Sequence, residues 1–490
     1  MNYSMILYIL GHVLRIEGAF MAMPVLVGLI YHEGEGFAYL FIGVAAALTG
    51  TLLSRKKPER NVFYLKEGCI ATSLSWILMS LVGGLPFIMT GEIPSFVDAL
   101  FETVSGFTTT GASILRDVEA VSYTSLFWRN FTNWIGGMGV LVFLLAIVPL
   151  SGGSNINLMR AESPGPVVEK LRPKMKYTAQ ILYLIYIIMT LIEFVLLLAG
   201  GMPAFDAITH TFGTAGTGGF GIKNSSLGGY SPYCQWVVTI FMILFGVNFN
   251  AYYLLLFRRF RKAFTMEEVR WYFILIVGAS ALIFADIVRL YPTVFESLTH
   301  AVFQVSSIIT TTGFSTTDFN LWSPSSKWIL LTLMFIGACA GSTGGGIKVS
   351  RVIITIKAVC RELRTYIHPK SIQNVKIDDK QVSPEIIRSI NVYLITLVII
   401  FVMSVFLISL EGYDLVTNFS AVATTLNNIG PGLELVGPTQ NFALFSPFSK
   451  LVLIFDMLAG RLELFPLLLL FHPSIWKDAA QRMRIIKNKT

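Results

Sequence analysis

The sequence has little charge for its length. Only 13% of its 490 residues are Asp, Glu, Lys or Arg, whereas 54% are hydrophobic, and the mean hydropathy is +0.66. Soluble globular chains carry about 25% charged residues. The longest polar stretch, about residues 361–388, is short enough to be a loop, which leaves no room for a soluble domain. The composition therefore predicts a protein embedded in a lipid bilayer.

Cysteine is also scarce. The four cysteines are scattered through or beside apolar segments and show no paired spacing: Cys69, Cys234, Cys339 and Cys360. Such cysteines are interpreted as small apolar side chains. The pattern implies neither a disulfide framework nor a metal site.

Long apolar runs, in contrast, are abundant. A helix that crosses the bilayer core needs roughly 20 apolar residues. We expect ten spans, near residues 17–31 (a short one), 37–54, 69–88, 126–150, 179–201, 234–257, 271–290, 327–358, 390–410 and 449–471. The first run has the position of a signal peptide, but Arg15 and Glu17 lie inside it and a second run follows directly. An uncleaved helix is therefore expected.

The basic residues form five clusters between these spans, near residues 55–66, 160–176, 258–270, 348–388 and 477–489. By the positive-inside rule the clusters face the cytoplasm, and both termini lie on that side with them. The net charge of +8 is thus explained by membrane topology, and no nucleic-acid partner is expected.

One pattern recurs four times after an N-terminal pair of helices. Each copy has a long apolar helix, a short segment that begins with an acid, a turn rich in Gly and Thr, and a second long helix. The acid precedes the turn glycine by 13, 13, 17 and 16 residues. The predicted divisions are a two-helix extension (1–66), repeat 1 (67–160), repeat 2 (161–262), repeat 3 with an intramembrane gate loop (263–380), and repeat 4 with a basic tail (381–490).

The charge clusters also set the symmetry. Each repeat begins and ends at a basic cluster, so all four have one orientation and are related by an axis along the membrane normal. A short segment of about 12 residues is ~18 Å long and reaches halfway across a ~30 Å core. Its C-terminal end carries partial negative charge and favours a cation. The predicted fold is an all-α membrane protein with four M1–pore helix–M2 repeats in a pseudo-four-fold arrangement.

The four turns are the candidate ion site. A ring of backbone carbonyls can replace the water around an alkali ion, and glycine permits the backbone angles that aim those carbonyls inward. The predicted filter consists of Thr109, Thr110, Gly111, Thr217, Gly218, Gly219, Thr311, Thr312, Gly313, Asn428, Ile429 and Gly430. For any single turn the alternative is a glycine that lets two helices approach closely. The flanking residues differ between copies, which predicts fewer well-formed ion sites than in a symmetric filter.

A glycine-rich break interrupts the second helix of repeat 3. Each glycine costs about 1 kcal/mol in a helix relative to alanine, so we expect a mobile loop that crosses the pore as a gate. The predicted gate residues are Ala340, Gly341, Ser342, Thr343, Gly344, Gly345 and Gly346. A kinked packing helix is the alternative.

Arg461 lies within an apolar run, where a charge costs about 2.5–3.5 kcal/mol on insertion scales. A water-filled pore beside the gate carbonyls would offset that cost, so Arg461 is predicted to be an electrostatic barrier and a gate partner. The alternative is a structural ion pair with Asp456 or Glu463, although those spacings do not place the side chains on one helix face.

These features resemble the Trk/Ktr/HKT superfamily of potassium transporters. The resemblance rests on Gly111, Gly219, Gly313 and Gly430, on the glycine-rich break and on Arg461, and the extra N-terminal helix pair is similar to the bacterial TrkH/TrkG branch. It implies K⁺ as the transported ion at the filter carbonyls, a homodimer, a cytosolic ring of nucleotide-binding, TrkA-like RCK subunits, and a location in the bacterial inner membrane. In plant members serine at the first glycine position goes with sodium transport, so four glycines resemble the potassium-selective pattern.

The sequence is therefore expected to encode potassium uptake through a cytosolically gated, channel-like pore. The alternative is a symporter that couples K⁺ to H⁺ or Na⁺ in the same pore. A membrane enzyme is not expected, because no nucleophile and base lie at a suitable spacing. No organic cofactor is expected on this chain.

Overall fold

The computed structural model describes residues 2–56, 58, 64–137, 139, 175–369 and 373–473, and these are almost entirely helical. Within those ranges six helical segments are long and apolar enough to cross a membrane. They are α1 with α2 (Tyr3–Phe20 and Ala22–Tyr31), α3 (Gly36–Leu53), α4 (Leu65–Thr90), α9 (Met175–Ala199), α14 (Glu267–Ile287) and α18 (Pro384–Ser409). The fold is an all-α membrane protein. A two-stranded antiparallel hairpin, β1 (Lys376–Ile377) and β2 (Lys380–Gln381), pairs Lys376 with Gln381.

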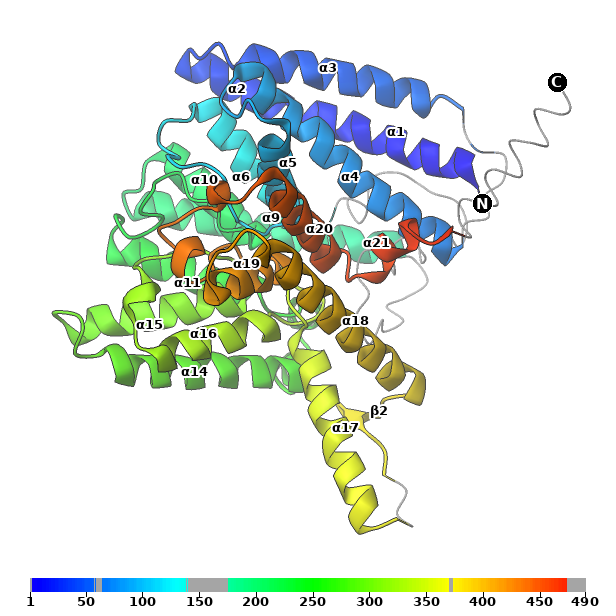
Figure 1. Ribbon diagram of the computed structural model, residues 1–490, viewed down its shortest axis with the longest axis vertical. Coiled ribbons are helices and arrows are strands. Elements are labelled where there is room, and N and C mark those ends of the chain that lie inside the picture. Colours follow the sequence, from blue (N-terminus) through cyan, green and yellow to red (C-terminus); the bar gives the residue numbers. More distant parts are fainter. Residues whose placement is uncertain are drawn as a thin grey trace, which may run out of the picture.

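The first span of the N-terminal extension is longer than expected. Its first span begins at Tyr3 and not near residue 17, because α1 buries Glu17 against the rest of the protein and continues through Met21 into α2. Helices α1 and α3 cross at glycines: a Cβ placed on Gly11 would lie 2.8 Å from Gly50 O. Close backbone contact of this kind is how membrane helices pack without a hydrophobic driving force. Figure 1 shows this pair along one edge of the molecule, opposite α14.

Each of the four first helices (α4, α9, α14 and α18) is followed by a short helix. The short helices are α5 (Phe96–Phe107), α10 (Ala204–Gly216), α15 (Val294–Ile309) and α19 (Leu415–Asn427). Ser95, Thr293 and Asp414 cap three of them by accepting a hydrogen bond from the third helical N–H. Side-chain caps of this type satisfy the free N–H groups of a first turn, which fixes where the helices start.

The second helices share a start signal as well. They are α6 (Tyr123–Gly137), α11 (Pro232–Phe245), α16 (Pro324–Ile336) and α20 (Pro447–Arg461). Ser231, Ser323 and Ser446 are N-caps, each followed by proline at the first helical position. Serine supplies the capping oxygen, and proline there loses no hydrogen bond.

The prediction of long second helices is wrong for three units. Helices α11, α16 and α20 have 14, 13 and 15 residues, which is too short for the roughly 20-residue span. The spans expected at 234–257 and 449–471 are each broken, as is 327–358, where a break was predicted. The chain resumes as α12 (Phe249–Leu256) after a 90° bend, as α17 (Val349–Ile367), and as α21 (Phe465–Leu470). Residues 140–150 of the span expected at 126–150 lie outside the described ranges, as do residues 160–174 and 477–489 of two predicted basic clusters.

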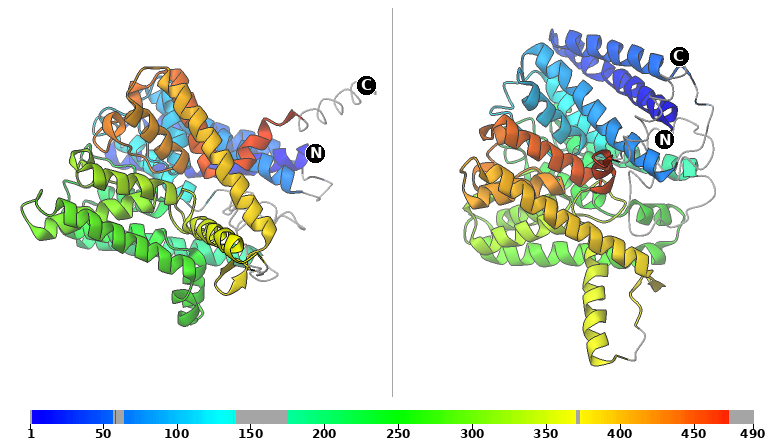
Figure 2. Two further views of the ribbon diagram at one scale, coloured as in Figure 1. Left: turned by 60° about the horizontal axis from the view of Figure 1, so that its bottom comes forward. Right: turned by 45° about the vertical axis from the view of Figure 1, so that its right-hand side comes forward.

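The remaining elements are short connections: α13 (Phe260–Phe264) and three 3₁₀ turns, η1 (Phe319–Leu321), η2 (Glu434–Val436) and η3 (Phe442–Leu444). Helix α17 projects from the body of the molecule, as both Figure 1 and the right-hand view of Figure 2 show.

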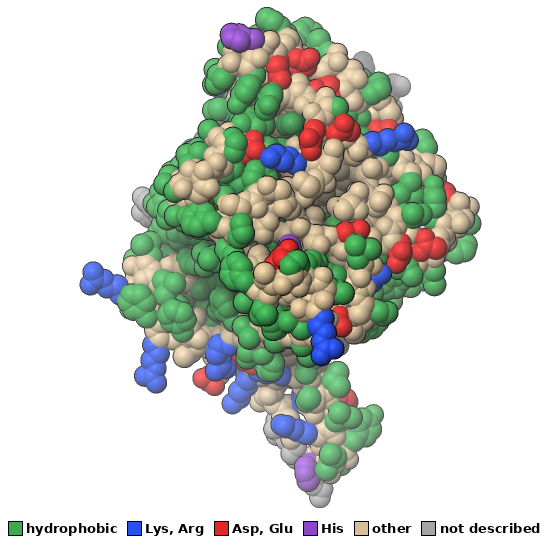
Figure 3. Space-filling view, turned by 90° about the vertical axis from the view of Figure 1, so that its left-hand side faces the viewer, with side chains coloured by type: hydrophobic (Ala, Val, Ile, Leu, Met, Phe, Trp, Pro, Cys, Tyr) green, Lys and Arg blue, Asp and Glu red, His purple; other side chains and the backbone are tan. Residues whose placement is uncertain are grey.

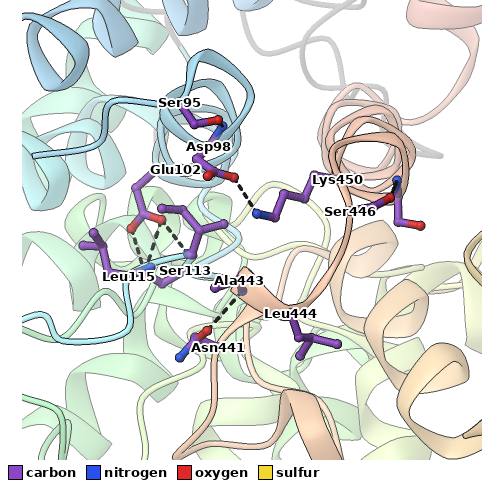
Figure 4. Close-up of polar contacts among 12 residues, drawn as sticks. Ser95, Asp98, Glu102, Ser113, Leu115, Asn441, Ala443, Leu444, Ser446 and Lys450 are labelled. Carbon is purple, nitrogen blue, oxygen red and sulfur yellow. Dashed lines mark hydrogen bonds and ion pairs between the residues drawn. The ribbon is translucent and has the colours of Figure 1, made fainter. Parts of the chain in front are cut away.

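The four units are arranged in a ring. Each second helix packs against the short helix of the following unit: α6 against α10, α11 against α15, and α16 against α19. Helix α20 of the last unit then packs against α5 of the first and closes the ring. An ion pair between Lys450 Nζ and Asp98 Oδ1, at 2.5 Å, ties this closing contact together (Figure 4). The turns that follow the short helices therefore all lie toward a common centre.

Candidate functional site

The four predicted turns meet at this centre. Every turn glycine lies so close to a carbonyl oxygen of the next turn that an added Cβ would come within 3.0 Å of it, a separation that real Cβ atoms essentially never show. The contacts run in cyclic order, from Gly111 to Gly218 O, from Gly219 to Thr312 O, from Gly313 to Ile429 O and from Gly430 to Thr110 O. The structure thus brings all twelve predicted filter residues into one closed ring.

The turns also share one backbone conformation. In each turn the glycine has positive φ: Gly111 (80°), Gly219 (65°), Gly313 (87°) and Gly430 (102°). The residue two positions before the glycine also has positive φ: Thr109 (55°), Thr217 (54°), Thr311 (59°) and Asn428 (56°). The residue between these two has negative φ in all four turns. Alternation of this kind lets successive carbonyls face the same side of the chain. Positive φ is unusual for a β-branched residue, and strain of about 1–3 kcal/mol per residue is characteristic of ligand clamps.

Helix termination explains why the turns form here. The N–H after each αL residue bonds to a carbonyl five residues earlier, as in Thr110 N to Ser105 O (2.8 Å) and Ile429 N to Thr424 O (2.9 Å). The αL residue itself bonds three residues back, as in Thr109 N to Gly106 O (3.0 Å). These two bonds define a Schellman motif, which ends a helix and satisfies its last carbonyls. The C-terminal ends of the four short helices, with their partial negative charge, therefore lie at the ring and favour a cation.

A vestibule leads to one side of the ring. All four turn glycines line it together with the segments that follow the turns. Figure 3 views the molecule from the left-hand side of Figure 1 and shows a hollow near the middle of that face, bordered by polar surface.

The acid that caps the fourth short helix, Asp414, is charged. Partial burial raises its pKa, but the hydrogen bonds from Thr417 outweigh that effect and leave the pKa of Asp414 below its ordinary value. The helix cap therefore keeps its charge.

On the other side of the ring lies the glycine-rich loop, residues 337–348. Gly345 N donates to Thr311 Oγ1 at 2.6 Å, and a Cβ on Gly344 would lie 2.8 Å from Thr310 O. The loop also contacts the break in the second unit, where Cys339 N donates to Gly246 O at 3.1 Å. The predicted gate residues thus lie directly against the end of the third short helix.

Arg461, the last residue of α20, contacts both this loop and the first unit. Its Nη1 donates to Thr343 O at 2.9 Å, and its Nη2 donates to Gly137 O at 3.0 Å and to Gly136 O. The carboxylates considered as alternative partners have other contacts. Glu463 forms an ion pair with Arg351, and Asp456 Oδ1 accepts from Ser404 Oγ at 2.7 Å. The guanidinium of the fourth unit therefore binds carbonyls of the third and first units.

Two features of the site were missed from the sequence. One is the break at Gly246–Asn248, which a hydropathy window averages away. The other is Glu268 at the start of α14, whose carboxylate accepts from Ala340 N (2.7 Å), Ser350 N (3.1 Å) and Asn248 Nδ2 (3.1 Å). In the sequence, Glu268 could have been noticed as an acid at the edge of the apolar run of α14. Glu268 fixes both ends of the loop.

Side chains do not offer a metal site of their own: within the described ranges no group of three or more His, Cys, Asp or Glu is arranged to hold a metal ion. The ligands that the four turns can supply to a cation are backbone carbonyl oxygens.

Comparison with known proteins identifies relatives over nearly the whole chain. Residues 37–478 match the family model described as "TrkH: Cation transport protein". The Trk system potassium uptake protein TrkH of Salmonella typhimurium is 36% identical over 489 residues, covering 98% of this chain and 100% of that protein. The Trk system potassium uptake protein TrkG of Escherichia coli K12 is 30% identical, covering 97% of this chain and 99% of that protein. The crystal structure of the potassium transporter TrkH from Vibrio parahaemolyticus superposes with a TM-score of 0.87 at 30% identity, covering 97% of this chain and 100% of that one.

Proposed function

Because the chain belongs to the TrkH family of cation transport proteins, we propose that it takes up potassium through the ring of four turns, by channel-like permeation gated from the cytoplasm. The chain is a membrane transporter and not an enzyme. The observation that carries the proposal is the closed ring itself. Four short helices end at it, four αL–Gly turns form it, and one vestibule reaches all four glycines.

The proposed mechanism follows from charge and geometry. An ion that enters the vestibule exchanges its water for ring carbonyls, which already point at it and need no reorganisation. The helix C-terminal ends stabilise a positive charge at the same place and disfavour an anion. The ion then passes toward the loop on the far side of the ring.

The gate is proposed to be the loop at residues 337–348 together with Arg461. The bond from Arg461 Nη1 to Thr343 O supports a closed arrangement, because the guanidinium then links the loop to α6 across the path. A fixed positive charge on the path also repels a cation electrostatically. Opening requires the loop to leave both Arg461 and Thr311.

Flux from reconstituted vesicles tests the proposal. Purified protein in liposomes is expected to carry K⁺ down its gradient, at a rate that does not change when a pH or Na⁺ gradient is imposed. Stoichiometric movement of H⁺ or Na⁺ with K⁺ would establish the symporter instead. A protein that folds and inserts but carries no K⁺ under any gradient would refute both.

The assembly is proposed to be a homodimer in the bacterial inner membrane, with both termini in the cytoplasm and a nucleotide-binding RCK ring on that side. Support comes from α17, which projects from the body (Figure 1) and exposes one apolar stripe. The stripe comprises Ile356, Val359, Leu363 and Ile367. An exposed apolar stripe of this length marks an interaction surface. Leu363→Glu is expected to yield monomers in detergent, as measured by light scattering, whereas the parent chain elutes as a dimer.

A further inference from the structure

A buried ion pair lies beside the vestibule, outside the ring itself. Arg129 of α6 places its Nε 2.5 Å from Glu102 Oε1 of α5. The exposed fractions of the two side chains are 3% and 0%, so neither charge is solvated by bulk water. A buried pair is poor evidence for stability, because apolar side chains of similar volume often serve as well. Stability is therefore not the role that the position of this pair beside the vestibule indicates.

The pair holds the backbone that follows two neighbouring turns. Glu102 accepts from Ser113 Oγ (2.9 Å) and Ile114 N (2.9 Å), which lie just after the first turn (Figure 4). Arg129 Nη1 donates to Gly221 O (2.8 Å), which lies two residues after the glycine of the second turn. Each anchored atom is therefore two or three residues from a ring glycine.

An aromatic ring completes the contact. The guanidinium of Arg129 lies 3.6 Å from the centroid of Phe220, which is itself buried and follows Gly219 directly. Arginine presents its donors in a rigid plane that can stack and bond at the same time, whereas lysine cannot do both. Arg129 thus holds the segment after the second turn in two ways. The edge of its guanidinium bonds to Gly221 O, and the face stacks on Phe220.

The other three units lack this device. The position nine residues before the turn glycine, Glu102 in the first unit, is His210, Gln304 and Ala421 in the others. Arg129 lies seven residues after Ser122, the serine that directly precedes α6, and the same position after Ser231, Ser323 and Ser446 is Val238, Leu330 and Leu453. None of the other three units has a carboxylate at the first position, and at the second position all three have an apolar residue. The charges serve the junction between the first two turns alone.

We propose that Glu102 and Arg129 are positioning residues that set the discrimination between K⁺ and Na⁺. They hold the carbonyls of the first and second turns at the separation that suits the larger ion, because a carbonyl anchored two residues away cannot close in on a smaller one. This proposal rests on potassium permeation through the ring and adds the residues that determine its selectivity. Neither side chain has to touch the ion.

The decisive variant removes both charges together. Glu102→Gln with Arg129→Leu leaves no buried unpaired charge and places at residue 129 the side chain found in two other units. In liposomes the ratio of K⁺ to Na⁺ flux is expected to fall about tenfold relative to the parent chain, which corresponds to about 1.4 kcal/mol of differential binding. K⁺ flux itself is expected to persist.

Two further variants separate positioning from charge and from folding. Arg116→Leu removes a positive side chain that also lines the vestibule, and it is expected to leave the ratio unchanged. Arg129→Lys keeps the charge but not the planar fork, and it is expected to lower the ratio by less than the double variant does.

The outcomes divide cleanly. A double variant that inserts normally and keeps the parental ratio overturns the proposal, as does one that only reduces the amount of folded protein at an unchanged ratio. An equal fall in Arg116→Leu would assign the effect to vestibule charge and overturn it too. A parent chain that carries no K⁺ would instead refute the proposed function.

Discussion

Gly313→Ser is the sharpest test of the ring, because the substitution adds a side chain at a close contact between two turns. A Cβ at residue 313 would lie less than 3.0 Å from Ile429 O, whereas ordinary contact begins at 3.4 Å. The carbonyl must therefore move by more than 0.4 Å. Ion–ligand distances vary by only about 0.2 Å around their preferred values, so this displacement is enough to spoil an ion site.

The backbone contributes a second cost. Gly313 has φ of +87°, where an L-residue is strained by about 1–2 kcal/mol. Gly412 provides the matched control, because it has φ of +82° and nothing within 4 Å of an added Cβ. Gly412→Ser therefore imposes the same kind of strain without pushing on the ring.

Parallel K⁺ and Na⁺ flux measurements in liposomes distinguish the two effects. Gly313→Ser is expected to lower the ratio of K⁺ to Na⁺ flux by at least about tenfold, or about 1.4 kcal/mol, while Gly412→Ser keeps it. A well-inserted Gly313→Ser protein with the parental ratio would show that these carbonyls do not select the ion, and the reasoning from the ring would fail.

Three other substitutions, with one control, probe the gate and a helix cap. Arg461→Ala removes charged hydrogen bonds worth about 1.5 kcal/mol or more each, so K⁺ flux is expected to rise about tenfold; a fall at normal expression would indicate a purely structural role. Thr311→Val removes the acceptor of Gly345 N and is expected to raise flux about fivefold, from a loss of about 1 kcal/mol, without changing the ion preference. Thr217→Val is its control, because Thr217 Oγ1 donates to the carbonyl next to it and not to the loop; equal effects would contradict a loop contact. Ser231→Ala is expected to lower stability by about 1 kcal/mol, measured by thermal unfolding in detergent, because it removes an N-cap; an unchanged midpoint would argue against that cap.

Local chemistry made much of the site predictable. The four turn glycines could be identified from the sequence because each follows a short apolar segment. Glycine after a helix favours termination with positive φ, which the structure contains at Gly111, Gly219, Gly313 and Gly430. The repeat followed from the spacing of acids and glycines, and the charge clusters predict one orientation for all four copies. Arg461 stood out because a charge in an apolar run must have a polar neighbour.

The breaks in the second helices were less accessible. The interruption at residues 337–348 was visible because it is long and rich in glycine. The breaks at residues 246–248 and 462–464 are only three residues long, and a hydropathy window of about 19 residues passes over them. The spans expected there were consequently drawn as continuous.

The sequence by itself determined that the chain enters a membrane, that one pattern occurs four times, and that each copy ends a short helix at a glycine. These properties depend on hydrophobicity and on backbone angles, which are local to a few residues. Only the tertiary structure decided the order of the ring, the partners of Arg461 more than a hundred residues away, and the pairing of Glu102 with Arg129. Those contacts depend on how whole helices pack against one another, and packing is settled by the shape of every neighbour at once.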